Sequence, residues 1–166
     1  MKKQVYIDSK ELQQAMNHLL SDSQVYYQNL RAFHWLVKGN QFFEMHAKFE
    51  EYYTQAADDI DEIAERIMMI GGKPLHTFED YMEFASISPK KDLENLSEII
   101  PAIINNVEHL LSSYRNIAEI AAESGDRGTE ALMDDFIGAA EKQLWMLNSL
   151  SIGVGASIKE NAAYAS

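Results

Sequence analysis

Apolar residues recur at intervals of three and four through one long stretch of this chain, between residues 42 and 70. The stripe consists of Phe42, Met45, Phe49, Tyr53, Ala56, Ile60, Ile63, Ile67 and Ile70. This period matches the turn of an α-helix that buries one face. Gly39-Asn40 precedes the stretch and Gly71-Gly72-Lys73-Pro74 follows it, and both are typical helix stops. The sequence therefore predicts one long amphipathic helix between two breaks.

The residues before this helix carry a second apolar stripe, from Leu12 to Val37. Asp8 or Ser9 stands where an N-cap is needed, and Glu11 falls in the first turn, where an acid favours the helix dipole. A single apolar face of this length predicts that the helix packs lengthwise against the helix at 42–70.

Two more long helices are expected in the second half of the chain. One starts near Ser97, which would place Pro101 in the first turn, where its missing N–H does little harm, and it ends near Ser124-Gly125. The other runs from about Arg127 to Leu150, with Asp126 as its N-cap.

A long crossover joins the two halves, and Thr77 followed by Asp80 predicts one or two helical turns within it. Four long helices with one long crossover indicate an all-α fold, a four-helix bundle with a short extra helix in the connection. We expect residues 1–166 to form one domain, with a short arm at 1–7 and a tail at 153–166 that frays or packs locally.

Composition excludes several classes of function. The chain has 166 residues and no cysteine, which removes disulfides, thiolate metal sites and cysteine nucleophiles together. Its formal net charge of −12 favours cations over nucleic acid. Neither a membrane-length apolar run nor a secretion signal is evident, so we expect a cytoplasmic protein.

Two pairs of possible metal ligands lie at helical spacing within the helix at 42–70. His46 and Glu50 are four residues apart, as are Asp61 and Glu65, so each pair shares one patch of helix surface. Fifteen residues of helix separate the pairs by roughly 22 Å, which is too far for one ion. Either the pairs act separately, or an antiparallel second copy of the chain completes each site.

His34 extends the first of these pairs. Because Gly39-Asn40 lets the chain reverse, the end of the preceding helix should lie beside the start of the next, with His34 next to His46. The simpler explanation stays open at this point, since such histidines usually lie at the edge of a core and such acids usually belong to a solvated face.

The same residues carry a resemblance to a known family. The pattern consists of His34-Trp35-x-x-x-Gly39, His46-x-x-x-Glu50, Ile60-Asp61-x-Ile63-Ala64-Glu65-Arg66 and Gly71-Gly72-x-Pro74. In these segments, and more weakly along almost the whole chain, the sequence resembles the Dps family, the mini-ferritins named for DNA protection in starved cells. The resemblance implies a ferritin-like bundle.

The resemblance also implies a site and an activity. In the Dps family His34, His46 and Glu50 of one subunit would hold iron together with Asp61 and Glu65 of its two-fold mate. The implied protein is a homo-oligomer, a dodecameric shell, that acts as a ferroxidase. It would oxidise Fe(II), preferably with hydrogen peroxide, and store the ferric product. Glu50 stands where the family often has aspartate, so the second iron could be held differently.

A di-iron centre inside the bundle is not expected from this sequence. Such a centre uses Glu-x-x-His motifs, and none of the five histidines has a glutamate three residues before it. We expect His18, His76 and His109 to have structural or surface roles. Trp35 and Trp145 are expected to be core aromatics, although the resemblance also allows Trp35 to lie near the iron.

Acidic residues gather around the turn between the last two helices. They are Glu123, Asp126, Glu130, Asp134 and Asp135. Related dodecamers have three-fold pores for iron at this place, so these residues are pore candidates. Acids that stabilise a helix N-terminus are an equally good explanation.

Two other functions remain open. A shell that coats DNA would need a basic arm, and residues 1–10 offer only Lys2, Lys3 and Lys10, with Asp8 among them. We therefore expect weak or absent DNA binding at physiological salt. The remaining possibility is a four-helix bundle without a metal.

Overall fold

The computed structural model describes the backbone of residues 9–164 and the side chains of residues 9–153. Within this range the chain forms α1 (Lys10–Leu36), α2 (Phe42–Met69), α3 (Phe78–Phe84), α4 (Leu96–Glu123) and α5 (Arg127–Tyr164), with no strand. The expected all-α, ferritin-like bundle is confirmed. The arm at 1–7, with Lys2 and Lys3, lies outside the described residues, as does Asp8.

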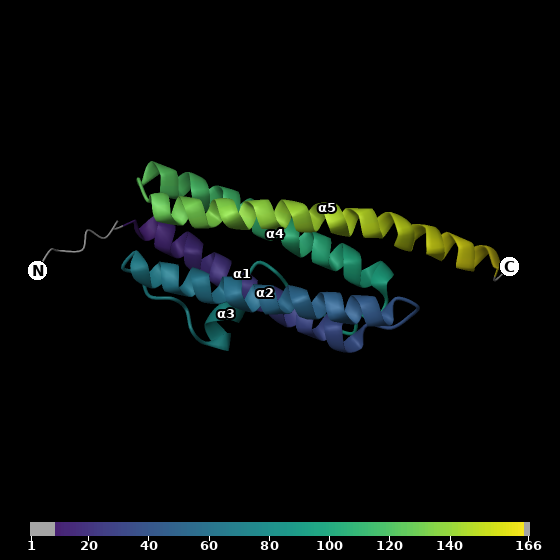
Figure 1. Cartoon of the computed structure of the whole chain (residues 1–166). Coiled ribbons are helices and arrows are strands. Elements are labelled where there is room, and N and C mark those ends of the chain that lie inside the picture. The colour runs from purple at the N-terminus through teal and green to yellow at the C-terminus, as the bar shows by residue number, and fades with distance from the viewer. Residues whose placement is uncertain (1–8, 165–166) are drawn as a thin grey trace, which may run out of the picture.

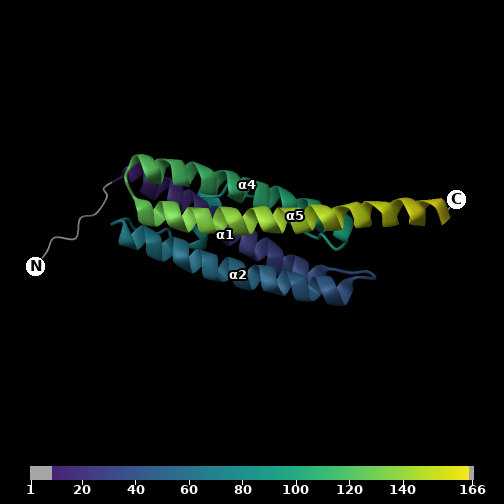
Figure 2. The same cartoon turned by 45° about the horizontal axis from the view of Figure 1, so that its top comes forward.

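The four long helices form two antiparallel pairs. α1 packs along α2, α4 packs along α5, and α1 also contacts α4 (Figures 1 and 2). The apolar faces predicted from the sequence meet between the pairs, where Leu30, Phe49, Ile63 and Ile103 are fully buried. In the described residues no helix is long and apolar enough to cross a membrane.

Side chains close the helix ends as the sequence predicted. Ser9 accepts a hydrogen bond from Leu12 N at 3.2 Å and so caps α1, and Thr77 caps α3 in the same way. Gly39 has a φ of 112°, which lets the chain reverse between α1 and α2.

Two details of the helices differ from expectation. α4 begins at Leu96, so Pro101 lies in its second turn rather than its first, where the missing N–H costs one helical hydrogen bond. The expected tail at 153–166 is also wrong, because α5 continues to Tyr164 (Figure 1). Three alanines, Lys159 and Glu160 favour helix between residues 153 and 164, and they outweigh Gly153 and Gly155.

Three polar side chains of α1 hold the crossover in place. Asn17 donates to Lys73 O at 3.1 Å and accepts from Leu75 N at 2.8 Å. Asp22 accepts from Ser86 N at 2.6 Å and from Ile87 N at 2.8 Å. Each side chain thus satisfies backbone groups that a loop would otherwise leave unpaired.

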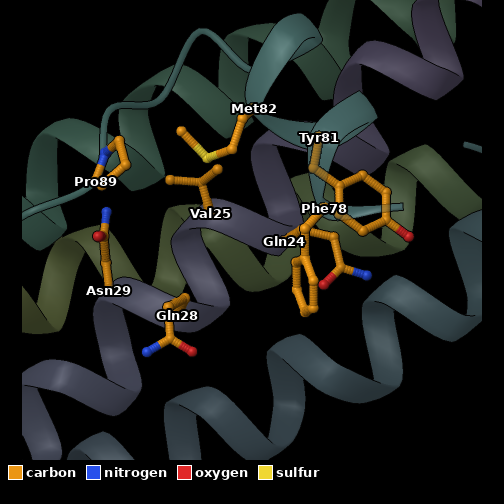
Figure 3. A pocket seen from close by; sticks show the side chains of 8 residues that line it. All are labelled: Gln24, Val25, Gln28, Asn29, Phe78, Tyr81, Met82 and Pro89. Atoms are coloured by element: carbon orange, nitrogen blue, oxygen red, sulfur yellow. The ribbon is translucent and has the colours of Figure 1, made fainter. Parts of the chain in front are cut away.

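Asn29 completes this ladder, since it donates to Ser88 O at 3.1 Å and accepts from Lys90 N at 2.8 Å. The crossover is therefore fixed at three levels along α1. A small, mostly apolar pocket remains between α1 and α3 (Figure 3). It is lined by Gln24, Val25, Gln28, Asn29, Phe78, Tyr81, Met82 and Pro89. No histidine or carboxylate is among these eight residues, so the pocket offers no strong metal ligand.

Candidate metal centre

His34 and His46 are neighbours across the α1–α2 turn, as the sequence predicted. His34 Nδ1 donates to the backbone oxygen of His46 at 2.7 Å, and His46 Nδ1 donates to the backbone oxygen of His34 at 2.8 Å. The two rings stack with their centroids 3.8 Å apart. Each imidazole is therefore held by the backbone that carries the other.

These reciprocal bonds decide which ring nitrogen is available. A carbonyl oxygen only accepts, so the Nδ1 atoms of both His34 and His46 must carry protons. In the neutral imidazole the lone pair then belongs to Nε2, which is the form that binds a metal ion. The fold thus presents two Nε2 atoms with free lone pairs, one from each of two different helices.

Aromatic side chains restrict the rotation of both rings. Phe42 stacks on His46 with centroids 5.1 Å apart, and Tyr53 meets His34 edge-on at 5.3 Å. His34 is 8% exposed and His46 is half-buried. The hydrogen bonds and the ring contacts therefore hold both histidines in place, while His46 remains partly exposed to solvent.

The three carboxylates are positioned differently. Glu50 follows His46 by one turn, whereas Asp61 and Glu65 lie much farther along α2, and all three are exposed. None of them takes part in an ion pair between described residues. One chain therefore brings His34, His46 and Glu50 to one end of α2 and keeps Asp61 and Glu65 apart from them.

No group of three histidine or acidic side chains able to hold an ion occurs within the described part of a single chain. His34, His46 and Glu50 are therefore not arranged as a complete three-ligand site within one chain. The ligand roles of these five residues remain predictions.

The interior of the bundle contains a different kind of polar site. A small, partly open cavity among α1, α2, α4 and α5 is lined by Tyr26, the exposed Gln55, Asp59, Tyr114 and Gln143 together with apolar side chains. Burial raises the pKa of Asp59 to about 6, although a hydrogen bond from Gln55 opposes the shift. With one carboxylate and no histidine among its lining residues, this cavity does not resemble a di-iron centre.

The histidines outside the pair have local roles, as expected. His18 donates to Phe84 O at 3.1 Å and His76 donates to Pro74 O at 3.0 Å. His109 donates to the buried carboxylate of Asp22 at 2.8 Å. These contacts hold the crossover and leave the three residues out of the candidate centre.

Two expectations about other residues are wrong within the chain. Trp35 is 56% exposed and Trp145 is 68% exposed, so neither is a core aromatic. Trp35 lies under the Arg31 guanidinium, 4.9 Å from its ring centroid, on the surface of α1. The apolar periodicity of α1 and α5 places both tryptophans off the buried stripe, which the sequence alone could have revealed.

The second expectation is the placement of Asp126 among the pore candidates. Asp126 is 2% exposed and cannot line a pore from this position. It caps α5 by accepting from Thr129 N at 3.2 Å, and it pairs with Arg66 at 2.5 Å. Burial works against ionisation, but the bonds from Thr129 and Arg66 prevail and lower the pKa of Asp126. Its role as N-cap was predicted, whereas its partner on α2 was not.

Comparisons with known proteins agree with this architecture. The model of the ferritin-like domain family matches residues 13–151. The DNA protection during starvation protein of Porphyromonas gingivalis is 38% identical over 134 residues, which cover 81% of this chain and 84% of that protein. DNA protection during starvation protein 2 of Bacillus anthracis is 40% identical over 141 residues, 85% of this chain and 97% of its own.

The chain belongs to the Dps family. The solved Dps structure from Vibrio cholerae O1 has a TM-score of 0.84 and 42% sequence identity, covering 85% of this Dps chain and 89% of that one. That protein is described as a member of a broad superfamily of ferritin-like diiron-carboxylate proteins. Dps membership therefore connects the present fold with a superfamily defined by iron and carboxylate ligands.

Proposed function

We propose that this Dps chain is a ferroxidase that binds Fe(II) at sites shared between two subunits and stores the oxidised iron. The observation that carries the proposal is the reciprocal bonding of His34 and His46, because it leaves the Nε2 atoms of two neighbouring imidazoles free to bind a metal ion. Membership of the diiron-carboxylate superfamily supports the same ligand chemistry.

The proposed site combines residues of two chains. His34, His46 and Glu50 of one subunit face Asp61 and Glu65 of a second subunit, which runs antiparallel across a two-fold axis. Imidazole with hard carboxylate oxygens suits Fe(II) and also tolerates Fe(III). Each carboxylate that this arrangement needs is exposed and without an ion-pair partner among the described residues.

The proposed oxidant is hydrogen peroxide, which the family resemblance favours. Two Fe(II) ions give one electron each, the O–O bond breaks, and two protons complete two molecules of water. Because both electrons arrive together, no hydroxyl radical is released. The chain's residues hold the two ions close enough for this and keep coordination positions open for peroxide.

Storage requires a closed assembly, and we propose a shell of twelve subunits with an acidic interior. Glu123, Glu130, Asp134 and Asp135 remain candidates for acidic pores, because all lie near the α4–α5 turn and none is buried. Asp126 leaves this set for the reasons given above. A formal net charge of −12 per chain favours the uptake of cations.

The test uses purified protein loaded anaerobically with Fe(II), to which substoichiometric hydrogen peroxide is added. Ferric absorbance and residual peroxide are followed in the wild type and in Asp61→Ala. Rapid oxidation with peroxide consumption in the wild type, and its loss in the variant, are expected. Equal rates in the wild type, the variant and buffer would contradict the proposal and leave a bundle without a metal function.

DNA protection is the second candidate, because several relatives are named for it. The charge of this chain argues against tight binding, since DNA affinity depends on basic groups that replace counterions. We expect no retardation of duplex DNA by the assembled protein at physiological salt. Retardation that weakens steeply with added salt would instead favour a DNA-coating role.

A further inference from the structure

Arg66 lies on the same turn of α2 as Glu65, but its side chain bonds to residues at the start of α5. Its Nη2 donates to Oδ1 of Asp126 at 2.5 Å, and its Nε donates to Oγ1 of Thr129 at 2.9 Å. Asp126 also accepts from both the backbone N and the hydroxyl of Thr129. One buried carboxylate thus caps α5 and neutralises the arginine of α2 at the same time.

The first turn of α5 leaves space for this guanidinium at Gly128. A Cβ added there would come within 2.7–2.9 Å of three guanidinium atoms of Arg66. The guanidinium is therefore packed against backbone and bonded to Asp126 and Thr129 through two of its nitrogens, while its Nη1 donates weakly to Sδ of Met69 at 3.9 Å. Such a planar, bonded arrangement fixes the direction of the whole side chain.

Other carboxylates would attract Arg66 if its bonds to Asp126 and Thr129, in what we call the α2–α5 corner, did not hold it. Glu62 precedes it by four residues, which is the favourable spacing for an acid and a base on a helix surface. Glu62 is exposed, as are Asp61 and Glu65 on the same part of α2. A guanidinium turned onto this surface would add positive charge beside the carboxylates that we assign to Fe(II).

We propose that Asp126 is a positioning residue that keeps Arg66 in the α2–α5 corner and so leaves the Asp61–Glu65 half-site negative and open to Fe(II). This inference rests on the proposed function. It gives the Arg66–Asp126 ion pair a role in metal affinity that is separate from its role in stability.

The experiment compares the wild-type assembly with Asp126→Asn and with the double variant Asp126→Asn/Arg66→Met. Asparagine is a good N-cap, so the start of α5 is retained while the charge that neutralises Arg66 is lost. Anaerobic calorimetric titration with Fe(II) gives the dissociation constant. Thermal unfolding of each variant is recorded in parallel, so that a loss of fold is recognised.

The single variant is expected to bind Fe(II) about threefold to tenfold more weakly, because an uncompensated positive charge lies near the ion. The double variant is expected to return to wild-type affinity, since it has no guanidinium to compete. Such a rescue is not expected from a purely structural ion pair. Unchanged affinity in Asp126→Asn, or a double variant as weak as the single one, would overturn the inference.

Asp61→Asn is titrated alongside to separate this inference from the function on which it rests. Wild-type affinity in Asp61→Asn would overturn the proposed function, and the inference with it. Weak binding in Asp61→Asn combined with unchanged binding in Asp126→Asn would overturn the inference alone.

Discussion

The reciprocal bonds of His34 and His46 make their metal-binding form a property of the backbone. Each Nδ1 is committed to a carbonyl oxygen, so each Nε2 keeps its lone pair without help from a carboxylate. Replacement of either histidine by alanine removes one metal-binding Nε2 atom. It also leaves the carbonyl oxygen of the other histidine without its hydrogen-bond donor. The two residues should therefore behave as a unit.

At this scale we predict that His46→Ala weakens anaerobic Fe(II) binding at least about tenfold, the usual size of the loss when a ligand or its support is removed. His76→Ala is the matched control, because His76 is exposed and bonds only to Pro74 O. Calorimetric titration of both variants measures the effect. Equal binding by the two variants would remove His46 from the site.

At the scale of the elements, the crossover depends on α1 for its polar contacts. Asp22→Ala would leave the backbone amides of Ser86 and the buried Ile87 without an acceptor and would also release His109. We predict a loss of about 2–4 kcal/mol in the free energy of unfolding, the cost of unpaired buried groups. Hydrogen exchange should accelerate at these two amides in particular.

Glu141→Gln is the control for this prediction. Glu141 forms an exposed ion pair with Arg115, so its loss should cost less than about 1 kcal/mol. If Asp22→Ala were no more destabilised than this control, the crossover would be held by its apolar contacts rather than by the ladder.

Two glycines of α5 give opposite predictions. Gly128→Ala would push the Arg66 guanidinium away from its partners and should lower stability by about 1–2 kcal/mol. Gly138→Ala meets nothing within 4 Å in the middle of the helix and should raise stability by about 0.5–1 kcal/mol. Thermal unfolding of both variants decides the matter, and stabilisation by Gly128→Ala would contradict the packing described for Arg66.

Sequence patterns predicted these elements because each depends on local features. Ser9, Thr77 and Asp126 cap helices as expected, and the break at Gly39 brings His34 beside His46. The tautomers of that pair were not predictable, since they depend on distances between the backbones of two helices.

Arg66 could not be matched with Asp126 for a similar reason, because sixty residues separate them and only tertiary packing brings them together. Asp126 was consequently grouped with exposed acids of the α4–α5 turn. Trp35 and Trp145 were assigned to the core from the usual preference of their residue type, whereas their positions on the helices place them outside. Residue type misled here, and position within the helical period would have been the better guide.

For the whole molecule, the half-sites at the two ends of α2 make the proposed activity a property of a pair of chains. No single chain is expected to oxidise iron at this site, whatever its own stability. Proteins that lack one half-site should therefore complement proteins that lack the other. This consequence separates a shared centre from any centre that lies within one chain.

The most direct measurement mixes His46→Ala and Asp61→Ala in equal amounts, dissociates and reassembles them, and records iron oxidation with hydrogen peroxide. Native mass spectrometry verifies that mixed assemblies form. Each variant alone should be nearly inactive, and random pairing across a two-fold axis should restore about a quarter of the wild-type sites. Mixed assemblies that recover no activity would contradict a site shared between subunits.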